Sequence, residues 1–174
     1  SKLRPENASV NNSARTTTGA WSFADFYSYV CRMIGQNGRR GALMISMDIR
    51  HPDIEKFITM KRDLTKVTGA NVSVKISDSF MEAVENNESF TLQFPVDSAD
   101  PTHTTTIDAQ SLWNKIVESA TLTAEPGLLM WDNIINNLPA ECYRDEGFQT
   151  ITTNPCGEIP LSAYDSCRLV SLNL

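Results

Sequence analysis

Short apolar runs alternate with amphipathic segments along this chain, and this alternation limits the folds open to it more than any other feature. Residues 42–47 form a nearly all-apolar run, typical of a strand buried on both faces, and residues 71–76 alternate as a strand. Helices are expected over residues 23–36, 52–62, 79–85 and 107–122. Strands that alternate with helices at this spacing predict an α/β fold with a largely parallel sheet.

Capping residues and apolar stripes refine these expectations. Ser22 is expected to cap the first helix and Asp78 the third, because both side chains can accept backbone hydrogen bonds. The first helix gathers its large apolar side chains on one face: Phe23, Phe26, Tyr27, Val30, Met33 and Ile34. The last helix should turn inward Leu112, Ile116, Val117 and Ala120. Further strands are expected over residues 90–96, 127–131, 148–152 and 168–174, with a loop over residues 97–106.

The composition is that of an ordinary globular protein, since 41% of the 174 residues are apolar and 21% are charged. No run approaches about eighteen consecutive apolar residues, so no membrane span is expected. No apolar segment follows the first residues as in a secretory signal, which predicts a cytoplasmic protein. Residues 1–66 carry 11 Lys and Arg against 6 Asp and Glu, whereas residues 67–174 carry 4 against 15. This asymmetry favours a phosphate-facing end over direct contact with nucleic acid.

The four cysteines limit the kinds of disulfide and metal site that the chain can form. They are Cys31, Cys142, Cys156 and Cys167, and their spacing is too wide and irregular for a disulfide framework or a zinc knuckle. Reduced thiols are therefore expected, and with only 2 histidines no histidine-rich metal site is expected. Cys31, in a helix, and Cys142, in a polar loop, are interpreted as ordinary packing residues.

A glycine- and arginine-containing loop spans residues 36–41. Its glycines permit close backbone approach, and its arginines offer forked donors suited to a phosphate or a base edge. The candidate binding residues are Gln36, Asn37, Arg39 and Arg40. The alternative is the end of a helix followed by solvated arginines, and the pattern taken alone favours that alternative.

The sequence Asn154-Pro-Cys-Gly-Glu158 places an amide, a thiol and a carboxylate within five residues. If the loop is extended, Asn154, Cys156 and Glu158 point the same way. A neighbouring carboxylate disfavours a thiolate, so the set suits a neutral thiol in hydrogen-atom chemistry better than an ordinary nucleophile. The alternative is a structural turn whose cysteine simply packs. Cys167 either forms a redox pair with Cys156 or pairs with a cysteine elsewhere.

Taken together, the segments resemble the catalytic subunit of ribonucleotide reductase, and more closely its adenosylcobalamin-dependent (class II) form. The resemblance rests on an ordered set of motifs that runs through nearly the whole chain. They are Leu3-Arg-Pro5, Gly38-Arg-Arg-Gly-Ala42, His51-Pro-Asp-Ile54 with Phe57-Ile58, Phe80-Met-Glu-Ala-Val84, Ala124-Glu-Pro-Gly127, Thr153-Asn-Pro-Cys-Gly-Glu158 with Pro160-Leu161, and Asp165-Ser-Cys-Arg-Leu169 with Asn173-Leu174.

The resemblance implies that residues 1–174 form part of a catalytic domain, an incomplete portion of the ten-stranded α/β barrel of these enzymes. The loop over residues 153–161 would thread the barrel centre, with Cys156 as the thiyl-radical residue that takes the 3′ hydrogen of the substrate ribose. Glu158 would act as base on the 3′ hydroxyl and Asn154 would hydrogen-bond the substrate. Cys167 would be one of two cysteines that become a disulfide as the 2′ hydroxyl leaves as water.

The resemblance also implies partners. Residues 4–18, with Arg4 and Arg15, would form a first specificity loop, and residues 36–41 a second loop that reads the substrate base against a bound deoxynucleotide effector. The substrate would be a ribonucleoside diphosphate or triphosphate, and the reductant an external, thioredoxin-like dithiol. Adenosylcobalamin would bind in the full-length enzyme, at a site outside these residues. The remainder of the reductase barrel would be a further partner. Unpaired strand edges predict an oligomer, normally of identical chains.

Departures from the family pattern define the alternatives. The family's redox partner for Cys167 precedes the first loop, and no cysteine precedes Cys31 here. We therefore expect a portion of a longer reductase that is inactive alone. The alternative is one polypeptide of a naturally split reductase, a nucleotide-binding or assembly module that works with partner chains. A third hypothesis, an unrelated α/β thiol enzyme, predicts faster alkylation of Cys156 than of Cys142.

Overall fold

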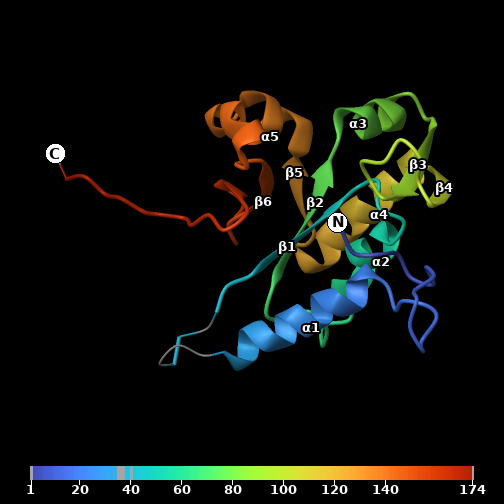
Figure 1. Ribbon diagram of the computed structural model, residues 1–174, viewed down its shortest axis with the longest axis horizontal. Coiled ribbons are helices and arrows are strands. Elements are labelled where there is room, and N and C mark those ends of the chain that lie inside the picture. Colours follow the sequence, from blue (N-terminus) through green and yellow to red (C-terminus); the bar gives the residue numbers. More distant parts are fainter. Residues whose placement is uncertain (1, 35–37, 40, 174) are drawn as a thin grey trace.

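The computed structural model describes residues 2–34, 38–39 and 41–173 (Figure 1). In chain order the elements are α1 (Ala20–Met33), β1 (Met44–Asp48), α2 (Ile54–Thr59), the 3-10 helix η1 (Met60–Arg62), β2 (Asn71–Ile76), α3 (Asp78–Glu85), β3 (Ser89–Phe94), β4 (His103–Asp108), α4 (Ala109–Thr123), β5 (Gly127–Met130), α5 (Trp131–Asn137), the 3-10 helix η2 (Pro139–Glu146), β6 (Thr150–Thr153) and β7 (Pro160–Ser162). None of the described helices is long and apolar enough to cross a membrane.

A parallel sheet in the order β1-β2-β5 forms the centre of the molecule. Two antiparallel hairpins, β3–β4 and β6–β7, accompany it. The predicted α/β architecture with a parallel sheet is therefore confirmed for the central strands. The described strands do not close into a barrel.

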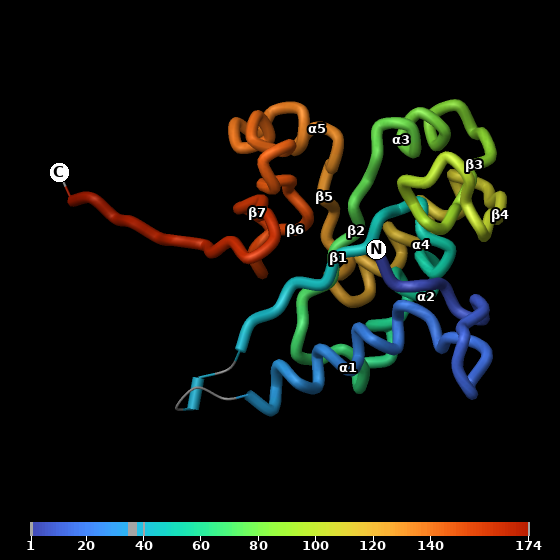
Figure 2. Tube along the Cα trace, in the orientation of Figure 1, coloured from blue at the N-terminus to red at the C-terminus, as the bar shows by residue number. Residues whose placement is uncertain are grey.

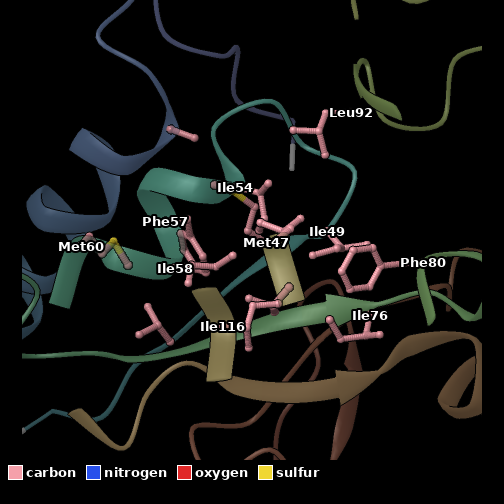
Figure 3. Close-up of a cluster of buried hydrophobic side chains, with 14 of the residues drawn as sticks. Met47, Ile49, Ile54, Phe57, Ile58, Met60, Ile76, Phe80, Leu92 and Ile116 are labelled. Carbon is pink, nitrogen blue, oxygen red and sulfur yellow. The ribbon is translucent and has the colours of Figure 1, made fainter. Parts of the chain in front are cut away.

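The central sheet has one apolar and one polar face because β2 alternates. Val72, Val74 and Ile76 are each at most 3% exposed and belong to the hydrophobic core. Neighbouring helices complete this core, with Phe57 from α2 and Ile116 from α4 (Figure 3). Burial of such side chains contributes about 1.5–3 kcal/mol each.

The other face of the sheet is polar. We call it the polar face and define it by the polar side chains of β1 and β2 that alternate with the core residues: Ser46, Asp48, Asn71, Ser73 and Lys75. By register, Met44 of β1 and Leu129 of β5 lie on the same face. In Figure 2 the β6–β7 hairpin lies on the side of the sheet away from α2 and α4. The two faces therefore receive different elements, helices on one and the hairpin on the other. β1 is half-buried at most of its positions rather than buried on both faces as predicted.

Helix starts show where local capping signals succeed and fail. Asp108 caps α4 by accepting a hydrogen bond from Ser111 N, and Ser77, not Asp78, caps α3 through Phe80 N. The prediction of Ser22 as a cap is wrong, because α1 begins at Ala20 after Gly19. Ser22 Oγ instead donates to the Gly19 carbonyl.

The predicted apolar face of α1 is exposed over much of its length. The residues of α1 that are buried are small: Ala20, Ala24 and Ser28. Phe26 is 58% exposed and Met33 67%. In α4, Val117 is likewise exposed, and Ser119 is buried with Leu112 and Ile116.

One loop prediction and one strand prediction are wrong. Residues 103–108 form β4, which pairs with β3, although the sequence predicted a loop up to residue 106. No sign of this strand is visible in the sequence because Thr104–Thr106 are exposed and show no apolar alternation. Residues 168–173 are not a strand; they are exposed and extend away from the rest of the molecule (Figure 1). A strand needs a neighbour to hydrogen-bond with, and the described residues supply none there.

The turn between β1 and α2 ties the N-terminal segment to the sheet. The His51 ring is fully buried; its Nδ1 accepts from Asp53 N, so its Nε2 donates to the Leu3 carbonyl at 2.9 Å. The buried Asp53 carboxylate accepts from Glu6 N at 3.0 Å and from Ala20 N at 2.7 Å. One short turn thus fixes both the start of the first loop and the start of α1.

We expect the stability of the chain to depend on His51 ionisation. Burial lowers the pKa of His51 below its ordinary 6.5, outweighing the opposing effects of the Leu3 carbonyl, Asp53 and Asp48. Below pH 6.5 the His51 imidazole is protonated in the unfolded chain but stays neutral in the folded chain. The free energy of unfolding therefore falls as the pH is lowered. Denaturant unfolding between pH 7 and 5 measures this slope, because above pH 7 the lowered pKa of Lys75, about 8, adds a pH dependence of its own.

His51→Gln should remove this slope, because the amide can still donate to Leu3 but does not titrate. His103→Gln is the control: it alters the other of the 2 histidines and should leave the slope intact. A slope that survives His51→Gln contradicts the assignment.

Candidate functional site

The loop between β6 and β7 is a hydrogen-bonded turn built around Asn154. Asn154 N donates to Ile159 O, and Ile159 N donates back to Asn154 Oδ1, both at 3.0 Å. Gly157 N donates to Asn154 O at 3.0 Å, with Gly157 at a φ of +86°. The side chain and both main-chain groups of Asn154 thereby close the turn.

This turn separates the three candidate residues by burial. Asn154 is 6% exposed, whereas Cys156 and Glu158 are exposed at the tip. The condition for all three to point one way, an extended loop, is not met. Asn154 still offers chemistry, since its Oδ1 is used within the turn and its Nδ2 has no hydrogen-bond partner among the described residues. Cys167 lies in the exposed terminal segment.

The polar face of the sheet contacts the chain on both sides of Asn154. Asn71 Nδ2 donates to Pro155 O at 2.8 Å, and Lys75 Nζ donates to Ile151 O. Sequence reasoning missed Asn71 and Lys75, although the alternation of polar residues along 71–75 is the signal that could have identified them.

Lys75 lies in a charged and aromatic setting. Its Nζ is 3.8 Å from the centre of the Trp131 ring, within reach of a cation–π interaction. Burial lowers the pKa of Lys75 to about 8, although Asp48 and Asp97 act to raise it. Lys75 is therefore still mostly charged at pH 7.

A second cation, Arg50, neutralises acid beside the polar face. It bonds Asp48 through Nε at 2.9 Å and through Nη2 at 2.8 Å, and Asp97 at 3.0 Å. Burial would raise the pKa of Asp48, but the hydrogen bond and charge of Arg50 lower it overall. Asp48 thus stays ionised beside Lys75.

The first predicted specificity loop, residues 4–18, forms a compact turn. Asn7 N bonds Thr17 O and Val10 N bonds Arg15 O, both at 2.9 Å. Arg4 and Arg15 are exposed. In the second loop Arg39 is exposed, and Gln36, Asn37 and Arg40 lie outside the described residues.

One pocket of about 570 Å³ lies between the first loop, the start of α2 and β4. Its lining is mainly polar and includes Glu6, Asp53, Lys56 and His103, but no residue of the 153–161 loop. A pocket of this volume suits an ordinary small molecule. It lies in a different part of the structure from the Cys156 turn.

Comparison with known proteins decides the family. A family model described as the barrel domain of ribonucleotide reductase matches residues 1–174. This chain belongs to that family. The expected resemblance is thus confirmed over the whole sequence.

Relatives in this ribonucleotide reductase family are much longer. The vitamin B12-dependent ribonucleoside-diphosphate reductase of Thermoplasma acidophilum is 35% identical over 100% of this chain and 22% of its own length. Its namesake from Mycobacterium tuberculosis is 34% identical over 100% of this chain and 24% of its own length. The putative ribonucleoside-diphosphate reductase large subunit of Frog virus 3 is 36% identical over 78% of this chain and 25% of its own length. The chain spans about a quarter of these relatives.

We expect Gly157→Ala to strain the turn. At a φ of +86° an alanine is disfavoured by about 1–2 kcal/mol, and the added Cβ would only touch Leu129 at an ordinary 3.8 Å. Gly147→Ala, at a φ of +95° with nothing within 4 Å of the added Cβ, is the matched control.

Both variants should lower the free energy of unfolding by similar amounts in denaturant titrations. Only Gly157→Ala should change the alkylation rate of Cys156 from that of the unaltered chain. An unchanged Cys156 rate in Gly157→Ala would mean that the turn does not set the exposure of Cys156.

Proposed function

We propose that this chain supplies the radical cysteine of an enzyme that reduces ribonucleotides to deoxyribonucleotides. The observation that carries the proposal is the turn that presents Cys156 and Glu158 at its tip and holds Asn154 beneath them. The same three residues were expected to act together from the sequence. Because the relatives above are named ribonucleoside-diphosphate reductases, we propose a diphosphate substrate.

The proposed chemistry begins at the ribose. The Cys156 thiyl radical takes the hydrogen atom from C3′, which gives a Cys156 thiol and a carbon radical on the substrate. Glu158 accepts the proton of the 3′ hydroxyl and gives a proton to the 2′ hydroxyl, which leaves as water. Exposure of both side chains leaves them accessible to a substrate.

Two electrons and two protons must then reach the substrate. Cys167 and a second thiol supplied from outside these residues would provide them and become a disulfide, which an external dithiol reduces. The Cys156 thiol returns its hydrogen atom to C3′ and is again a thiyl radical. Asn154 would donate through its unpaired Nδ2 to a substrate oxygen, which holds the ribose over Cys156.

The cofactor belongs to the complete enzyme. Two of the relatives described are vitamin B12-dependent, so we propose adenosylcobalamin as the group whose cleavage supplies the initial radical. We further propose that the loops over residues 4–18 and 36–41 bind a deoxynucleotide effector through arginines such as Arg4, Arg15 and Arg39, which suit phosphate.

The test is deoxynucleotide formation by a complete reductase that contains these 174 residues joined to the flanking segments of a B12-dependent relative. Cys156→Ser should abolish product, because a hydroxyl hydrogen is far harder to abstract than a thiol hydrogen. Glu158→Gln should lower kcat by about 10²-fold or more, the usual contribution of a positioned base.

Cys142→Ser alters an exposed thiol outside the turn and should leave the rate unchanged. The 174-residue chain tested alone should form no product with adenosylcobalamin and dithiol. Normal turnover by Cys156→Ser would refute the proposal.

A further inference from the structure

The Cys156 turn is attached to the sheet by side chains that the reaction scheme does not use. Two β2 side chains reach the main chain on either side of Asn154: Asn71 bonds Pro155 O, and Lys75 bonds Ile151 O. A third contact links Ser46 Oγ and Thr152 Oγ1 at a long 3.4 Å. All three donors or acceptors on the sheet belong to the polar face.

The spacing of these contacts shows that the chain around Asn154 is attached to β2 at two points. Asn71 and Lys75 are four residues apart on one face of β2, and their partners Pro155 and Ile151 are also four residues apart, in the opposite direction. Four residues of extended chain span about 13 Å. The segment 151–155 therefore runs antiparallel across the polar face and is held near both ends.

The two contacts act at different places. The Pro155 carbonyl belongs to the peptide unit that includes Cys156 N, so Asn71 restrains the unit next to the thiol. Lys75 restrains the strand before the turn and is itself held over the Trp131 ring. Leu129 of β5 also lies close to the turn, since a Cβ added at Gly157 would meet Leu129 Cδ2 at 3.8 Å.

We propose that Asn71 and Lys75 are positioning residues that fix where the Cys156 turn presents its thiol to the substrate. This inference rests on the proposed function for its catalytic meaning, but its structural content is independent of catalysis. Asn71 governs the position of Cys156 and Lys75 the direction from which β6 enters the turn.

The first test is amide hydrogen exchange in the 174-residue chain. Asn71→Ala should accelerate exchange at the amides that close the turn, those of Asn154, Gly157 and Ile159, by about five- to tenfold, the effect of losing one hydrogen bond. Lys75→Met keeps an apolar stem beside Trp131 and should accelerate exchange mainly at β6.

Asn137→Ala is the matched control. Asn137 is also an exposed asparagine whose Nδ2 donates to a main-chain carbonyl, that of Asn133, at 2.8 Å, but it lies on α5. It should leave exchange in the turn unchanged. If Asn71→Ala does not fold, Asn71→Asp preserves the shape, removes the donor and carries the same expectation. Turn amides as protected in the folded Asn71 variant as in the unaltered chain would overturn the proposal.

The second test uses the complete reductase described above. Asn71→Ala should lower kcat about tenfold with KM within about twofold, since the thiol is misplaced but substrate contacts remain. A merely structural role predicts equal loss of folded enzyme in Asn71→Ala and Asn137→Ala with unchanged kcat per folded molecule, and that result would overturn the positioning role. Accelerated exchange combined with full activity of Cys156→Ser would instead refute the proposed function and leave the attachment of the turn established.

Discussion

Hydrogen bonds between the polar face of the central sheet and the chain around Asn154 connect the fold to the site. β2 alternates, so that its valine and isoleucine side chains pack against helices while Asn71 and Lys75 face the hairpin. Both sets of side chains lie on one strand. The hydrophobic core that fixes this strand therefore also fixes the positions of Asn71 and Lys75, the donors that hold the turn.

Hydrogen bonds within the turn, made by Asn154, also fix the shape of the loop. The main-chain and side-chain groups of Asn154 hold Ile159 and Gly157, so a buried amide organises the loop whose tip carries the exposed thiol and carboxylate. A similar division occurs at the other end of the sheet, where buried His51 and Asp53 hold the first loop and α1. In both places a buried polar side chain satisfies main-chain groups of an exposed loop, which gives the loop a defined shape.

Local periodicity explains which elements the sequence could predict. The strand over residues 71–76 has the predicted bounds, and α2 with η1, α3 and β5 lie close to theirs, because a regular apolar pattern is sufficient to define each of them. β4 has no such pattern, and the terminal segment has the pattern without a neighbouring strand. The exposed apolar face of α1 shows the same limit: periodicity defines a face but not what covers it.

The site shows a parallel division. The spacing of Asn154, Cys156 and Glu158 identified them as a set, but the expectation that an extended loop points them one way is not met. The closed turn depends on hydrogen bonds that the residue types do not predict. Asn71 lies 84 residues before its partner Pro155, so only the folded chain brings them together. The roles of these residues in catalysis, and of the two loops in nucleotide binding, stay predictions.

The most direct measurement of the central claim is the deuterium content of unreacted substrate. A complete reductase containing this chain would be given a mixture of ribonucleotide with hydrogen and with deuterium at C3′, and the reaction stopped part-way. Transfer of the 3′ hydrogen to the Cys156 radical predicts that the remaining substrate becomes enriched in deuterium, because the C–D bond breaks more slowly. Remaining substrate with the starting deuterium content would contradict hydrogen-atom abstraction at C3′.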